Sequence, residues 1–133
     1  SLKRKINTKW FNYPRNAEKP VYGAYELTQV KEYPKEVIIC ESMLDALSVW
    51  QFGRYAVALN GTGSESQFEI LNKLPIRKYI LATDMDEAGK KARNILRKRL
   101  KNKVVTELVW DVNKAKDIND MSKEMFDSLK EIL

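Results

Sequence analysis

The sequence contains no histidine, and this absence removes several kinds of catalytic and metal-binding site. Ser-His-Asp and Cys-His catalysis both require histidine, as do zinc sites built from cysteine and histidine. The single cysteine, Cys40, cannot form an internal disulfide and lies in an apolar run. We therefore expect a buried thiol in a protein from a reducing compartment. Any bound metal ion would have to be held by carboxylates, carbonyls or water.

Long hydrophobic runs are also missing. No apolar stretch approaches the roughly 20 residues that a membrane-spanning helix needs, and no signal peptide precedes the first charged residues. We expect a cytoplasmic protein. The chain begins with Ser1 rather than methionine, which we interpret as a piece of a longer protein. The net charge of +6 suits a polyanionic partner such as nucleic acid, although charge alone does not identify one.

Apolar periodicity predicts strands that alternate with helices. The expected strands are residues 36–40, 55–59, 78–83 and 103–110, and the expected helices are residues 42–52, 65–74, 87–102 and 121–133. A weaker pattern favours a short strand within residues 21–30. This alternation predicts an α/β fold with about four mostly parallel strands and helices on both faces. We expect one domain over residues 21–133, preceded at 1–20 by a basic and aromatic arm or the remnant of another subdomain.

Carboxylates follow the predicted strands at their C-terminal ends. Asp84 and Asp86 come after one strand, Glu41 after another, and Asp117 lies in the loop after the last. Parallel strands bring these ends to one edge of the sheet, where α/β proteins bind ligands. Converging carboxylates repel one another unless a proton or cation lies between them, and Mg²⁺ prefers oxygen ligands. The sequence thus predicts a Mg²⁺ site, whereas Asp45 is explained by a capping box with the serine at position 42.

Glycine and basic residues near the same edge could contact phosphates. Gly61 and Gly63 form the turn after the second strand and allow close backbone approach, although a simple strand-to-helix turn explains them equally well. Lys90, Lys91 and Arg93 belong to a basic helix that could track a phosphate backbone. A charge-rich, solvated helix face is the alternative. The basic and aromatic arm could likewise stack bases or simply pack on the domain.

These motifs together resemble the TOPRIM domain. The resemblance rests on Glu41 after a strand, on the glycine turn, and on the motif DMDEAGKKA at residues 84–92. It covers about residues 19–120 and is closest to the DnaG-type bacterial and phage primases and primase-helicases. The segments KPVYG at 19–23 and KDIND at 116–120 are similar to that branch as well. The family usually has glycine after the glutamate, where this chain has Ser42.

The resemblance implies the catalytic region of a DNA primase, a nucleotidyltransferase that makes RNA primers on single-stranded DNA from nucleoside triphosphates. It implies Mg²⁺, replaceable by Mn²⁺, on Asp84 and Asp86 with Asp117 assisting, and Glu41 as general acid/base or further ligand. A replicative helicase is an expected partner, through regions outside this sequence, in the cytoplasm of a bacterial or phage-infected cell. Two alternatives remain: a stand-alone TOPRIM nuclease or RNA-processing protein, and a non-catalytic nucleic-acid-binding module. Whether the isolated domain is active is left open.

Overall fold

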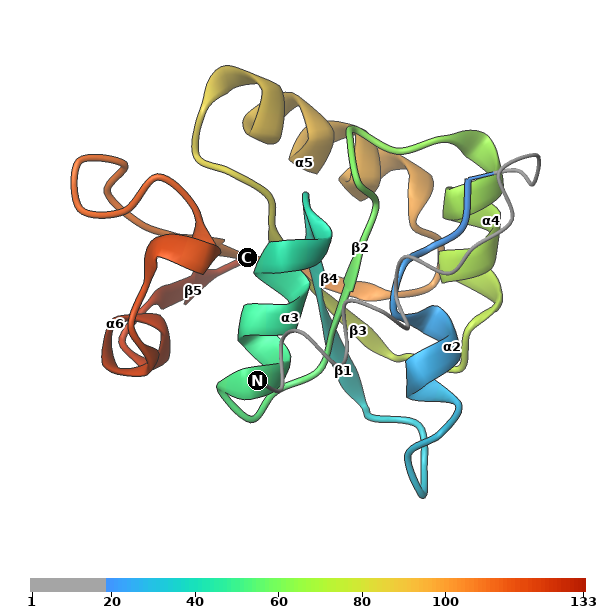
Figure 1. Cartoon of the computed structure of the whole chain (residues 1–133). Helices are drawn as coiled ribbons and strands as arrows, with labels where there is room; N and C mark the ends of the chain where they lie inside the picture. The colour runs from blue at the N-terminus through green and yellow to red at the C-terminus, as the bar shows by residue number, and fades with distance from the viewer. Residues whose placement is uncertain (1–18) are drawn as a thin grey trace.

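The computed structural model describes residues 19–133, which form a five-stranded sheet with helices on both faces (Figure 1). The predicted arm therefore lies, apart from its last two residues, outside the described part of the chain. The strands are β1 (Glu36–Cys40), β2 (Ala56–Ala58), β3 (Lys78–Ala82), β4 (Val104–Val109) and β5 (Lys130–Ile132). Their order in the sheet is β2-β1-β3-β4-β5.

The first four strands are parallel, as the alternating pattern predicted. β1 pairs with β2 and with β3, and β3 pairs with β4, all in parallel register. The helices between them are α3 (Met43–Gln51), α4 (Glu65–Lys73) and α5 (Glu87–Arg99). The C-terminal ends of β1 to β4 therefore share one edge of the sheet, which we call the C-terminal edge.

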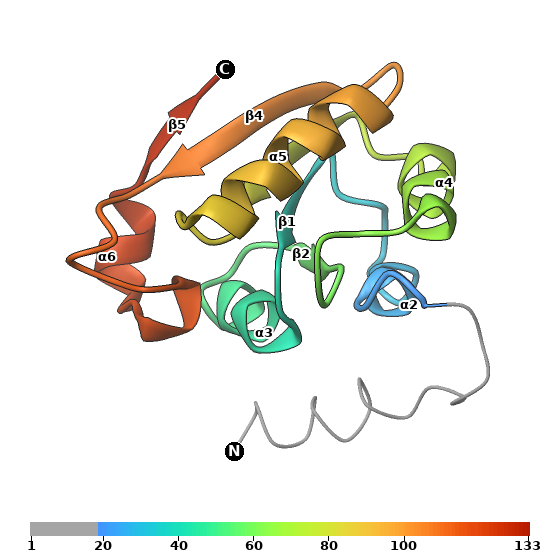
Figure 2. The same ribbon diagram turned by 90° about the horizontal axis from the view of Figure 1, so that it is seen from above.

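Alternate residues of the central strands enter two separate cores. On one face, Ile38, Cys40 and Ile80 pack against α3 and the later segments η1 (Ile118–Asp120) and α6 (Lys123–Asp127). On the other face, Val37 and Ile39 pack against α2 (Ala24–Leu27), α4 and α5. The two layers can be followed in Figure 2. Because both faces are buried, the central strands β1 and β3 are apolar after their first residue rather than alternating with polar residues.

The predicted strand within residues 21–30 is wrong. Only Tyr22 pairs with the sheet, through a single antiparallel bridge to Ala58. The next residue, Gly23, has φ 96°, a left-handed conformation that turns the chain away from the strand and begins α2. Leu27 of α2 is fully buried in the core of that face. The segment thus contributes apolar burial rather than an edge strand.

The predicted C-terminal helix over residues 121–133 is also too long. Helix α6 ends after Asp127, and β5 then pairs with β4 in antiparallel register. Glu131 of β5 bonds to Lys78 of β3 at 2.5 Å and to Thr106 of β4 at 2.9 Å. These long-range contacts outweigh the helical spacing of Leu129 and Ile132. The N-cap of α6 is Ser122.

Within residues 19–133, no helix is both long enough and apolar enough to cross a membrane.

Candidate metal and nucleic-acid site

The acidic residues predicted for the site all lie along the C-terminal edge. Glu41 directly follows β1, Asp84 and Asp86 follow β3, and Asp117 precedes η1. The carboxylates of Glu41, Asp86 and Asp117 each raise the pKa of Asp84, so all three act on it through space. The sheet thus brings together acids from positions far apart in the sequence.

Asp84 is the most strongly perturbed acid of this group. Burial is the main cause, followed by the charge of Glu41, and together with weaker effects from other acids they raise its pKa from 3.8 to about 7. Its Oδ1 is buried and has no hydrogen-bond partner among residues 19–133. A buried carboxylate oxygen without a donor is unfavourable for stability, and such groups are frequent at functional sites, which makes Asp84 a candidate site residue.

Glu41, like Asp84, has a raised pKa and a buried carboxylate oxygen. Burial raises its pKa, with Asp86 and Asp117 adding to the effect, while hydrogen bonding to Asp84 acts in the opposite direction. Its Oε1 is buried and, in the described part of the chain, no group forms a hydrogen bond with it. Glu41 and Asp84 therefore present two unsatisfied oxygens at neighbouring strand ends, β1 and β3 being paired in the sheet.

Asp86 and Asp117 also cap helical segments. Asp86 is the N-cap of α5, and its Oδ1 accepts a 2.7 Å hydrogen bond from the Gly89 backbone N–H. Asp117 caps η1, its Oδ1 accepting from the Asp120 N–H at 3.1 Å. Asp117 thus caps η1 as well as lying at the acidic edge. Each of these carboxylates keeps a second oxygen that the cap does not use.

Asp45 is a residue whose importance sequence reasoning underestimated. The predicted capping contact is present, since the Asp45 N–H donates to the Ser42 hydroxyl at 3.2 Å. In addition, Asp45 is 2% exposed, and its Oδ1 accepts a hydrogen bond from the backbone N–H of Asn119 at 2.9 Å. Asp45 thereby fastens η1, and with it Asp117, to helix α3. Burial raises the pKa of Asp45 to about 6.

The loop after β3 is packed too closely for any side chain at position 89. A Cβ atom on Gly89 would lie 1.9 Å from the backbone oxygen of Asp84. The Thr83 hydroxyl also donates to the Gly89 carbonyl at 2.6 Å. Helix α5 therefore begins directly against the backbone that carries Asp84. This contact explains the glycine of the motif in physical terms.

The glycine turn after β2 has structural contacts of its own. A Cβ on Gly63 would lie 2.7 Å from the ring of Phe68, and a Cβ on Gly61 would lie 3.0 Å from the Lys19 ammonium nitrogen. Lys19 donates to the backbone carbonyl of Asn60. The turn is thus explained by packing, and phosphate binding at Gly61 and Gly63 stays a prediction.

The basic residues of α5 divide into two groups. Lys90 and Lys91 are exposed and line an open depression of about 470 Å³ together with Glu87, Ala88 and Asn94. Arg93, in contrast, is buried and 2% exposed. The predicted phosphate contact of Arg93 is therefore wrong, because its guanidinium is enclosed by the protein. The spacing Gly89, Arg93, Leu96 places it on the buried stripe of α5, a signal that could have been noticed.

A metal-ligand group is not preassembled at this edge. Within residues 19–133, no three Asp, Glu or Cys side chains are gathered closely enough to serve together as ligands. The residues nevertheless fit a divalent cation, because the carboxylates repel one another and two of their buried oxygens have no donor among residues 19–133.

Comparison with known proteins agrees with this arrangement. The family model described as Toprim-like matches residues 38–122, which include most of β1, all of β2 to β4 and all four acids. The chain belongs to the Toprim-like family. The expected fold is also confirmed, since a crystallised DNA primase domain from Pseudomonas aeruginosa superposes with a TM-score of 0.64 and 25% sequence identity. That match covers 83% of this chain and 35% of the other.

The curated relatives of this Toprim-like chain are DNA primases. The DNA primase of Haemophilus influenzae is 35% identical over 75 residues, which are 56% of this chain. The DNA primase of Pasteurella multocida is 33% identical over 89 residues, or 63% of this chain. The matches span only 13% and 15% of those two proteins.

Proposed function

We propose that this chain is the catalytic Toprim region of a DNA primase, which uses Mg²⁺ to join nucleotides into RNA primers on single-stranded DNA. Two relatives at 33% and 35% identity that are DNA primases support this assignment. The matches cover only a small part of those relatives, so primase activity is proposed for the protein that carries this domain.

The observation that carries the proposal is the pair of buried, unpartnered oxygens, Oε1 of Glu41 and Oδ1 of Asp84. A cation at this position would satisfy both atoms and offset the repulsion that raises the pKa of Asp84. Asp86 and Asp117 would contribute the oxygens that their capping bonds leave available. This all-oxygen set suits Mg²⁺, and Mn²⁺ should replace it.

Bound Mg²⁺ would supply charge neutralisation on the phosphates and a lowered pKa of the attacking 3′-hydroxyl. The chain's own residues would do the rest. Asp84 and Asp86 would hold the ion, with Asp117 assisting. Glu41, with its raised pKa, would accept or return a proton at the reacting oxygen or serve as a further ligand. Lys90 and Lys91 would hold template or nucleotide phosphates over the exposed face of α5.

The partners follow from this reaction. The template would be single-stranded DNA, and the substrates would be nucleoside triphosphates. A replicative helicase would contact parts of the protein beyond this domain. Such a protein would work in the cytoplasm of a bacterial cell, on the cell's own DNA or that of a phage.

Mn²⁺ titration of the chain by calorimetry tests the metal site first. We expect wild type to bind Mn²⁺ and Asp84→Asn to lose most of that binding. Asp127→Asn is the matched control, because Asp127 is an exposed acid of α6 that pairs only with Lys123 among residues 19–133. In the whole protein that carries this domain, Asp84→Asn should abolish primer synthesis. Unchanged synthesis would disprove the role of Asp84.

The same preparations separate the alternatives. Cleavage of labelled nucleic acid by the chain, stopped by EDTA, would replace the primase assignment with a Toprim nuclease. Nucleic-acid binding that survives both EDTA and Asp84→Asn, without any synthesis by the whole protein, would favour a binding module.

A further inference from the structure

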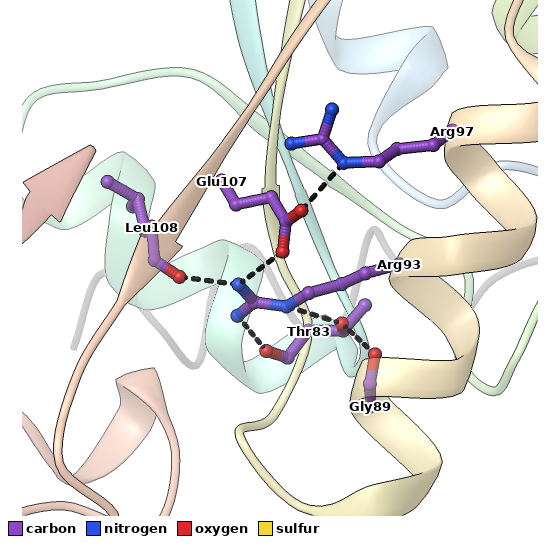
Figure 3. Close-up of polar contacts among 6 residues, drawn as sticks. All are labelled: Thr83, Gly89, Arg93, Arg97, Glu107 and Leu108. Atoms are coloured by element: carbon purple, nitrogen blue, oxygen red, sulfur yellow. Dashed lines mark hydrogen bonds and ion pairs between the residues drawn. The ribbon is translucent and has the colours of Figure 1, made fainter. Parts of the chain in front are cut away.

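Arg93 is among the largest fully buried side chains of the described residues, and its guanidinium lies between the ends of two strands (Figure 3). It donates to the backbone oxygen of Thr83 and, at 3.2 Å, to the Thr83 hydroxyl. It also donates at 2.6 Å to the backbone oxygen of Leu108. Arg93 thus bonds to β4 and to the residue that directly precedes Asp84.

The hydrogen bonds of Arg93 lie just beyond the point where the backbone hydrogen bonds between β3 and β4 end. The parallel pairing of β3 with β4 ends at Leu81 and Glu107. Beyond this pair, the carbonyls of Thr83 and Leu108 face the guanidinium instead of a neighbouring strand. Buried carbonyls need donors, and the planar fork of arginine can serve two at once. Arg93 therefore replaces the backbone ladder at the point where the chain leaves β3 to form the acidic loop.

The buried charge of Arg93 is balanced on one side by Glu107 and faces the acidic edge on the other. Glu107 is 3.3 Å from Arg93 and also accepts from Arg97 at 2.6 Å. The charges of Glu107 and Asp84 both act on the Arg93 guanidinium. The guanidinium carbon also lies 5.5 Å from the centre of the Trp110 ring. The acidic site thus has a fixed positive charge behind it.

We propose that Arg93 is a positioning residue for the acidic site, which holds Asp84 in place by clamping Thr83 to β4. The function of that site, metal-dependent nucleotidyl transfer, is the one proposed above, and this inference rests on it. Arg93 itself touches neither substrate nor metal. It acts through the backbone at Thr83.

Three variants of the full chain test the proposal. Arg93→Met removes the donors and the charge, while Arg93→Lys keeps a charge but cannot bond to Thr83 and Leu108 with a planar fork. Arg97→Met is the matched control, because Arg97 shares Glu107 with Arg93 yet, within residues 19–133, does not bond to Thr83. Each variant is first shown to be folded by circular dichroism at low temperature.

Two readouts follow, neither of which is activity. NMR order parameters of the Asp84 and Met85 amides should fall from about 0.85 towards about 0.6 in both Arg93 variants. The dissociation constant for Mn²⁺ should rise about tenfold or more, as for other residues that orient metal ligands. Arg97→Met should change neither. If Arg93→Met does not fold, Arg93→Lys decides the question.

Wild-type order parameters and Mn²⁺ affinity in a folded Arg93 variant would overturn the positioning role. The proposed function fails in a different way, when wild type itself binds no Mn²⁺. In that case the order parameters alone still decide whether Arg93 holds the Asp84 loop in place.

Discussion

Asp45 Oδ1 accepts a 2.9 Å hydrogen bond from the backbone N–H of Asn119, a residue 74 positions further along the chain. The bond joins the first helix after β1 to the short η1 segment that follows β4. Asp117 caps that segment, so its position at the acidic edge depends on Asp45. Asp45, which belongs to the first turn of α3, thus also helps to position Asp117 at the candidate site.

Asp45→Ala should destabilise the protein by about 1–3 kcal/mol, because it removes a buried acceptor from the Asn119 N–H. Asp45→Asn should lose less, since an amide oxygen can accept the same bond. Urea denaturation near pH 4, where burial keeps the Asp45 carboxyl protonated in the folded protein, measures both without the added effect of a buried charge. Asp127→Ala, which removes an exposed pair with Lys123, should change stability by about 0.5 kcal/mol or less. Equal effects of Asp45→Ala and Asp127→Ala would show that the bond to Asn119 is unimportant.

Gly89→Ala should destabilise the protein by about 1–3 kcal/mol, even though alanine is the better helix former. The new Cβ would meet the Asp84 backbone oxygen at 1.9 Å, so either α5 or the acidic loop must shift. Mn²⁺ affinity should fall together with stability. Thermal denaturation and calorimetry measure the two effects.

Asn94→Ala is the matched control for Gly89→Ala, because Asn94 is an exposed residue of the same helix. It should leave stability unchanged or slightly higher, as expected from helix propensity alone. A stabilised Gly89→Ala protein would contradict the close packing of α5 against Asp84.

Stability in EDTA should fall as the pH rises from about 4 to 7. Burial, followed by Glu41, raises the pKa of Asp84 to about 7, above the 3.8 of an ordinary aspartate. The folded protein therefore binds this proton more tightly than the unfolded chain. The resulting stabilisation is complete below about pH 4 and is lost as the pH rises through 7. Asp45, with its pKa raised to about 6, acts in the same direction at lower pH.

Asp84→Asn should remove the part of this fall in stability that is caused by Asp84 and that extends up to about pH 7. The variant should be more stable than wild type at pH 8 in EDTA, by about 1–2 kcal/mol after allowing for the partial exposure of the site. The difference should disappear near pH 4, where the wild-type carboxyl is protonated. Urea denaturation across this pH range measures it, and parallel curves for the two proteins would contradict the raised pKa.

The arrangement of the acids could be predicted from sequence because it follows from topology. Strands such as β1 and β3 are recognisable as apolar runs, and their parallel pairing places Glu41 and Asp84 at one edge whatever the details of the loops. The strand β5 could not be predicted in this way. Its pairing with β4 and the bond between Glu131 and Lys78 join distant segments, and the local spacing of residues 121–133 is helical.

Side-chain roles were harder to predict than element positions. Arg93 was assigned to phosphates because arginines on a basic helix are usually solvated, whereas the structure buries it against Thr83 and Leu108. The carbonyls that it satisfies are exposed only by the divergence of β3 and β4. The spacing of α5 could have indicated that Arg93 is buried, but the partners of Arg93 depend on where the pairing of β3 with β4 ends, which the sequence of α5 does not record.

Removing Lys90 and Lys91 should weaken the binding of single-stranded DNA and lower its dependence on salt. Both side chains are exposed on α5 and line the same depression near the acidic edge. Each phosphate contact on single-stranded DNA contributes about 0.7 to the slope of log affinity against log salt. The double variant Lys90→Gln/Lys91→Gln should therefore reduce the slope by about 1.4, as measured by fluorescence anisotropy with an oligonucleotide at several salt concentrations. Lys123→Gln is the control for these two lysines. It lies on the exposed surface of α6, removes one positive charge as each of the other substitutions does, and should leave the slope unchanged. If each of the three substitutions lowered the slope equally, the net charge of +6, rather than this face of α5, would attract the DNA.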